Sequence, residues 1–186
     1  MDTFIAALKV GPRGKVIGVD MTDEQRAKAE RLRDRDGFTN VTYVKGYIEN
    51  VPAPAASVDV VISNGVINLA TDKSKVFKEA ARLLKPGGRF AISDIVTEVQ
   101  LPETIVCNST LWAACIGGAA QQDNYRAQIT AAGMRRKTRY FAAFFASIIQ
   151  VDTTVSGLSE MLSMPCSTSH CARSGWSDGP CPQMPT

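Results

Sequence analysis

Apolar runs and charged segments alternate along the first half of the chain. Short, continuous runs rich in β-branched residues predict buried strands at residues 15–20, 41–45, 58–63 and 89–96. Helical spacing of apolar residues, with clear start or stop signals, predicts helices at residues 1–10, 22–35 and 73–84. Strands and helices that alternate at this spacing are typical of βαβ units and predict a doubly wound parallel sheet.

The pattern changes after the fourth predicted strand. Residues 102–118 predict an irregular helical insertion, and residues 121–132 predict a further helix. Residues 141–151 are apolar and fit either a strand or a helix, whereas the last part is rich in Ser, Pro, Gly and Cys without periodicity. We therefore divide the chain into an α/β core at 1–134, a continuation of sheet or helix at 135–155, and a disordered tail at 156–186.

Composition and charge narrow the class of protein. The sequence is 45% hydrophobic and 21% charged, as in soluble globular proteins, and its net charge of +3 comes from scattered Lys and Arg. Scattered charge of this size gives no reason to expect nucleic acid. No apolar run approaches the roughly 20 residues that cross a bilayer. The odd number of cysteines, five, in a chain without a leader pattern favours reduced thiols and a cytoplasmic location.

Asp20 is the first candidate for chemistry, because it ends the first predicted strand just before a helix start at Thr22. An acid at the carboxyl end of a parallel strand lies where nucleotide-like ligands bind, and it can accept hydrogen bonds from ribose hydroxyls. The alternative is an ordinary acid at the start of the helix. No Gly-x-Gly-x-x-Gly string precedes this strand, which disfavours a nicotinamide-dependent dehydrogenase.

Five strings carry a resemblance to a known family: residues 10–22, 45–50, 62–69, 84–88 and 111–118. On these strings the chain, from about Phe4 to about Met134, resembles class I S-adenosylmethionine-dependent methyltransferases and, more narrowly, arsenite methyltransferases. The Leu-Lys-Pro-Gly-Gly string alone indicates only a methyltransferase, whereas Asn-Gly-Val-Ile-Asn-Leu and Trp-Ala-Ala-Cys-Ile-Gly-Gly are far more specific. The resemblance implies a three-layer, Rossmann-like α/β fold and methyl transfer from S-adenosyl-L-methionine to arsenite, presented as a thiol conjugate.

The resemblance also implies a set of site residues. It implies that Asp20 binds the ribose of the cofactor and that Met21, Ile48 and Glu49 lie around the adenine. It also implies that the methionine end is bound by Asn64, Val66 and Asn68. Arsenic(III) binding falls to Cys115, which is also the one catalytic residue implied. A thiolate suits arsenic(III), which is a soft centre. No general base is needed, because the arsenic lone pair is the nucleophile of a positioned displacement.

Two departures from the family pattern matter. The family's glycine-rich loop is expected just before Phe4 and is not in this chain, and the strands that should complete the sheet are not recognisable after Met134. Gly65 stands where some members carry a cysteine, and the family's later arsenic-binding cysteine has no counterpart after Met134. We therefore expect an incomplete sheet. Three functions remain open: an arsenite methyltransferase, a methyltransferase for a small organic acceptor such as a quinone precursor, and a non-catalytic remnant.

The same residues also have ordinary structural explanations. Asn64 and Asn68 are common turn formers, Glu49 can be a solvated loop acid, and Cys115 can be a small buried residue. The cysteines at 166, 171 and 181, with the single histidine at 170, fit no established zinc spacing.

Overall fold

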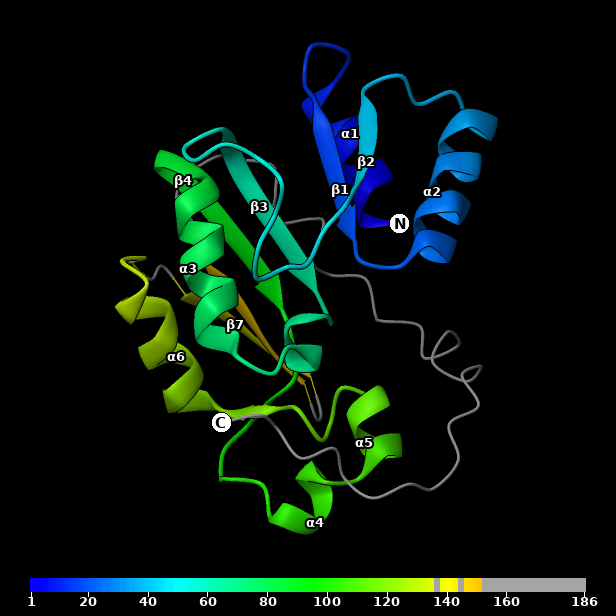
Figure 1. Ribbon diagram of the computed structural model, residues 1–186. Coiled ribbons are helices and arrows are strands. Elements are labelled where there is room, and N and C mark those ends of the chain that lie inside the picture. Colours follow the sequence, from blue (N-terminus) through cyan, green and yellow to red (C-terminus); the bar gives the residue numbers. More distant parts are fainter. Residues whose placement is uncertain (136–137, 144–145, 152–186) are drawn as a thin grey trace.

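The computed structural model describes residues 1–135, 138–143 and 146–151 (Figure 1). Its elements in chain order are α1 (Asp2–Val10), β1 (Val16–Asp20), α2 (Asp23–Arg35), β2 (Val41–Lys45), β3 (Val58–Asn64), the 3₁₀ turn η1 (Ile67–Leu69), α3 (Lys73–Leu83), β4 (Leu84–Ser93), β5 (Val96–Thr97), α4 (Glu103–Val106), α5 (Ser109–Ala113), β6 (Ala120–Gln121), α6 (Gln122–Ala131), β7 (Thr138–Ala143) and β8 (Ala146–Val151). The alternating strands and helices predicted for the α/β core are therefore present. No helix among these residues is long and apolar enough to cross a membrane.

The parallel strands form separate pairs, of which the third is the short pair β5–β6 and the two longer ones carry the architecture. β1 pairs in parallel with β2, and β3 pairs in parallel with β4. Within the described part of the chain, no strand hydrogen bonds join one pair to the other. Figure 1 shows the β1–β2 pair in blue and cyan beside the β3–β4 pair in green. We call these pairs, with the helices packed on them, the first half and the second half. The expected incomplete sheet is thus confirmed.

An antiparallel pair of strands, β7 and β8, follows the α/β core. β7 and β8 pair with each other, and β8 lies alongside β4. Residues 146–151 therefore form a strand, which decides between the two structures that the apolar pattern allowed. The tail predicted at 156–186, with its cysteines and histidine, lies outside the described residues.

β4 begins earlier than its sequence predicts. The Lys-Pro-Gly-Gly string suggests a sharp stop between helix and strand, but α3 ends at Leu83 and the string lies inside β4. The register shifts there, since Val58 faces Leu84 whereas Val60 faces Arg89. Gly87 has a φ of +79°, a left-handed conformation that glycine adopts at little cost. The string is thus an irregularity within the strand rather than a turn before it.

The second half contains the main hydrophobic core. α3 starts at Asp72, whose side chain accepts hydrogen bonds from the backbone N–H groups of Ser74 and Lys75. The buried face of α3 then packs on β4 and α6. The ring of Phe77 is fully buried and meets Tyr125 edge-on at 5.0 Å between centroids and Phe90 at 6.2 Å.

The first half is packed more lightly. α2 buries none of its residues. Contacts between α1 and the strands include a hydrogen bond between the Thr3 and Tyr43 hydroxyls and two bonds from the Asn40 amide to the carbonyls of Ala7 and Gly11. These polar contacts act together with the stacked rings of Phe4 and Phe38, 4.8 Å apart between centroids, in holding this half together.

Candidate functional site

Asp20 lies at the carboxyl end of β1, as its position in the sequence predicts. Its Oδ1 accepts hydrogen bonds from the backbone N–H of Thr22 at 2.8 Å and from the Thr22 hydroxyl at 2.7 Å. No described residue donates to its second oxygen, Oδ2, and the side chain is half-buried. Thr22 therefore fixes the orientation of the carboxylate and leaves one oxygen for a further donor.

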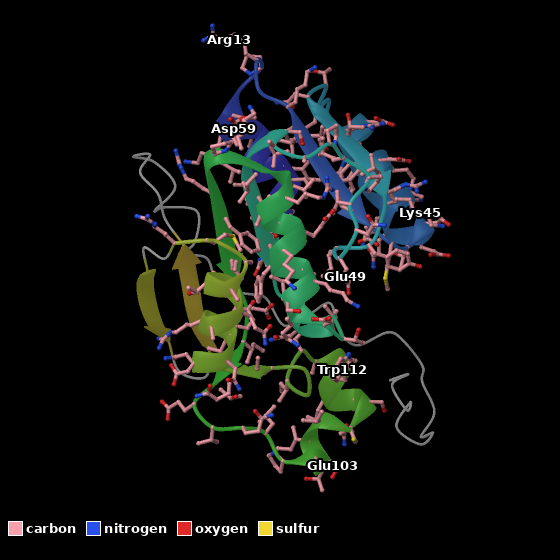
Figure 2. The ribbon with its side chains drawn as sticks, turned by 60° about the vertical axis from the view of Figure 1, so that its left-hand side comes forward. Arg13, Lys45, Glu49, Asp59, Glu103 and Trp112 are labelled. Carbon is pink, nitrogen blue, oxygen red and sulfur yellow. The ribbon has the colours of Figure 1, made fainter. Side chains whose placement is uncertain are left out.

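The residues predicted around the adenine gather near the same strand ends. The N–H of Gly46 donates to the carbonyl of Asp20 at 3.2 Å and so joins the loop after β2 to the end of β1. Ile48 and Glu49 follow on this loop and are half-buried, with Ile48 packed against the main core. Met21 is 59% exposed. Figure 2 shows Glu49 where this loop approaches α3.

A second group of predicted residues lies on the loop after β3. Asn64 is exposed at the end of that strand, and Val66 is 41% exposed. Gly65, with a φ of +69°, turns the chain between them, and its N–H donates to the carbonyl of Ser93 at 2.8 Å. Asn68 differs from Asn64, because it is 0% exposed within η1.

Cys115 lies against this loop, although 50 positions separate it from Gly65 in sequence. Its thiol Sγ donates to the carbonyl oxygen of Gly65 at 3.1 Å. The side-chain amide nitrogen of Asn68 donates to the carbonyl of Ile95 at 2.7 Å and to that of Cys115 at 3.4 Å. The structure therefore brings the predicted arsenic-binding thiol to the predicted methionine end of the cofactor site.

A buried carboxylate, Asp94, lies beneath this loop. Its Oδ1 accepts from the N–H of Ile95 at 3.0 Å, and its Oδ2 accepts from the N–H of Asn68 at 3.2 Å. Burial raises the pKa of Asp94 to about 6, even though these hydrogen bonds and the nearby charge of Lys73 favour its ionised form. Burial also lowers the pKa of Lys73, an effect that Asp94 opposes, and raises the pKa of Tyr125.

Asp94 and Lys73 are not among the site residues predicted from the sequence. A signal for Asp94 was available, because this acid follows the apolar run of β4 just as Asp20 ends β1. Lys73 offers no such signal, since a lysine in the first turn of a helix is usually solvated. Only the packing of α3 over the end of β4 brings its charge near Asp94.

The site residues thus form two groups. One lies at the ends of β1 and β2 and comprises Asp20, Met21, Ile48 and Glu49. The other lies after β3 and comprises Asn64, Val66, Asn68 and Cys115. Among the described residues, no hydrogen bond or ion pair links one group to the other. A pocket of about 410 Å³ runs along β1 and β2 from residues 12–17 to residues 39–44 and includes none of these residues.

Known proteins resemble the chain over its α/β core. A family model described as a methyltransferase domain matches residues 1–133. The arsenite methyltransferase of Halobacterium salinarum is 42% identical over 132 residues, which cover 71% of this chain and 34% of that protein. The human arsenite methyltransferase is 42% identical over 127 residues, covering 63% of this chain and 34% of that protein.

A solved structure shows the same likeness. An arsenic(III) S-adenosylmethionine methyltransferase from Chlamydomonas reinhardtii superimposes with a TM-score of 0.66 at 33% identity, covering 75% of this chain and 51% of that chain. This chain spans about a third of the length of the curated relatives above. The likenesses confirm the resemblance and the Rossmann-like α/β fold predicted from the sequence. Because the family model covers well over half of its residues, the chain belongs to the methyltransferase domain family.

Proposed function

We propose that this chain is the core of an enzyme that transfers a methyl group from S-adenosyl-L-methionine to arsenite. The observation that carries the proposal is the contact between the Cys115 thiol and the Gly65 carbonyl, at the end of β3. It sets a soft, thiolate-forming ligand beside the strand ends where a nucleotide-like cofactor binds. The relatives named as arsenite methyltransferases support the same substrate.

The residues of the first half fit S-adenosylmethionine, which supplies a methyl group on a positively charged sulfur when it is bound. In our proposal, the second oxygen of Asp20 accepts hydrogen bonds from the ribose, because Thr22 already occupies the first. Met21, which is well exposed, covers the adenine ring, and Ile48 and Glu49 border its edge.

The second half would hold the methionine end and the acceptor. Asn64 and Val66 face outward after β3 and line the methionine end, with Asn68 in the turn behind them. Cys115 binds arsenic through its thiolate and orients the arsenic lone pair toward the cofactor side of the loop. Small thiols would fill the other arsenic positions, so the substrate is a thiol conjugate. Reduced thiols also fit a cytoplasmic location, which we include in the proposal.

Two substitutions test this function against the alternatives. We expect Cys115→Ser to abolish arsenite-dependent methylation, measured by mass spectrometry of methylated arsenicals. Cys107→Ser is the matched control, because Cys107 is an exposed thiol outside the loop contact and its loss should leave the rate within about twofold. Equal rates for both variants would contradict the role of Cys115. A wild-type chain that binds S-adenosylhomocysteine but methylates no arsenical would contradict arsenite as the acceptor.

A non-catalytic remnant makes a different prediction. Such a chain would bind S-adenosylhomocysteine weakly or not at all in a calorimetric titration and would not bind arsenite at Cys115. We expect both to bind, and we expect Asp20→Asn to weaken cofactor binding while leaving arsenite binding unchanged. Asp20→Asn therefore separates binding of the cofactor from binding of arsenite.

A further inference from the structure

Cys115 has a backbone conformation that few residues of its type adopt. Its φ of +62° lies in the left-handed region, which is unfavourable for any side chain with a Cβ. Such a conformation persists only where the surroundings fix it. The N–H of Cys115 donates to the carbonyl of Trp112 at 2.9 Å, so one side of the residue is held by its own turn. The other side is held from across the molecule.

Asn68 supplies that second contact. Its amide nitrogen bridges the carbonyls of Ile95 and Cys115, and its whole side chain is buried. The chain around Gly118 also packs on it so closely that an added Cβ at Gly118 would lie 1.9 Å from the Asn68 carbonyl oxygen. The turn that contains Asn68 and the loop that contains Cys115 are therefore locked together.

Asp94 holds Asn68 in turn. Its two oxygens accept from the N–H groups of Asn68 and Ile95, so a single carboxylate fixes the backbone of Asn68 and of one of the two residues that the Asn68 amide bonds. The contacts run from Asp94 through Asn68 to Cys115.

We propose that Asn68 is a positioning residue for the Cys115 thiol, held in place by Asp94, rather than a contact of the cofactor. The inference deepens the proposed function, because it concerns the same thiol. A residue that is 0% exposed and spends its amide nitrogen on two backbone carbonyls offers no donor to a ligand. Asn64, four positions earlier and exposed, is the residue of this loop that a cofactor can reach.

The test compares Asn68→Ala with Asn64→Ala in the full chain. Alkylation of Cys115 by iodoacetamide is followed peptide by peptide, with Cys107 in the same sample as the internal reference. We expect Asn68→Ala to change the Cys115 rate about fivefold, upward, because the loop loses the contact that keeps its thiol on the Gly65 carbonyl. Calorimetry should find the dissociation constant of S-adenosylhomocysteine within about twofold of wild type. Asn64→Ala should leave the Cys115 alkylation rate near that of wild type and weaken the binding of S-adenosylhomocysteine.

Methylation kinetics add a second readout, in which Asn68→Ala raises the KM for arsenite and leaves the KM for S-adenosylmethionine near wild type. An unchanged Cys115 alkylation rate together with weaker cofactor binding would overturn the proposal and make Asn68 a cofactor contact. Alkylation and calorimetry need no turnover, so they decide the role of Asn68 even if arsenite is not the acceptor.

Asp94→Asn is the second variant for this measurement, to be used if Asn68→Ala does not fold. It conserves the shape of the side chain and removes a buried charge, so the variant should remain folded. Because an amide has one acceptor oxygen in place of two, we expect a smaller rise of the Cys115 alkylation rate, about two- to threefold. A rate equal to wild type in a folded Asp94→Asn chain would contradict the proposed sequence of contacts.

Discussion

The two halves of the molecule are built from the same βαβ unit but are packed very differently. In the second half, α3 and α6 bury Phe77, Ile92 and Tyr125 against β4. In the first half, α2 buries nothing, and Ile17 in β1 remains 49% exposed. Folding free energy is therefore concentrated in the second half, since buried apolar area is its main source. The proposed ribose contact lies in the lightly packed half, whereas the proposed arsenic-binding thiol lies against the densely packed one.

The largest difference in stability between the halves is expected when one apolar side chain is removed from each. Phe77→Ala should lower the free energy of unfolding by about 3–5 kcal/mol, because it leaves a cavity between α3, β4 and α6. Ile17→Ala, at a half-exposed strand position, should cost about 1 kcal/mol. Urea unfolding followed by circular dichroism measures both. Equal losses would mean that the two halves contribute alike.

The pH dependence of the free energy of unfolding tests the second half separately, because Asp94 lies in that half. Its folded-state pKa of about 6 lies above its ordinary value of 3.8, so the folded protein holds this proton more tightly than the unfolded chain does. The contribution of Asp94 to stability therefore falls as the pH rises from about 4 to about 6, by about 2–3 kcal/mol, and is level outside that window. Lys73 is the charged group that acts on Asp94, and the charge of Asp94 in turn helps to raise the pKa of Tyr125.

The measurement is the difference in unfolding free energy between Asp94→Asn and wild type, taken at pH 4, 5, 6 and 7. The difference should shift in favour of the variant across this range, because asparagine does not titrate. Carboxylates whose pKa is lowered, such as Glu79, cancel in this difference. A difference that does not vary with pH would show that Asp94 is not desolvated.

The smallest expected effect concerns the helix starts of the two halves. Asp72→Ala removes a side chain that caps α3 and should cost about 1 kcal/mol of stability. Thr22 begins α2 without a capping hydrogen bond from its own side chain, so Thr22→Ala should cost less. Its hydroxyl instead orients Asp20, and its loss should weaken binding of S-adenosylhomocysteine about two- to fivefold. Calorimetry and thermal unfolding separate the two effects, and a stability loss equal to that of Asp72→Ala would contradict the assignment.

The sequence predicted the elements of the core well, because their apolar periods are strong and their ends carry local signals. Asp72, for example, caps α3 directly before residue 73, where the predicted helix begins. The prediction that Lys-Pro-Gly-Gly forms a sharp stop before the strand is wrong. Local turn chemistry does not reveal that β3 pairs with this segment. Tertiary pairing decided the strand's first residue.

The site was predicted less evenly. Asn64 and Asn68 have the same chemistry and lie in one loop, so the sequence gives them the same role. Only the turn at η1, which buries one and exposes the other, distinguishes them. The approach of Cys115 to Gly65 could be expected only from the family resemblance, because it depends on how the α5–β6 loop folds back over the end of β3.

The separation of β1–β2 from β3–β4 has a consequence for the protein in concentrated solution. In the described part of the chain, β1 is bonded only to β2, and β3 only to β4, which leaves each with one edge whose backbone amides and carbonyls lack strand partners. Such edges are templates for any extended peptide. We therefore expect the protein's colloidal behaviour, its tendency to self-associate or to capture unfolded chains, to be governed by these two edges rather than by its net charge.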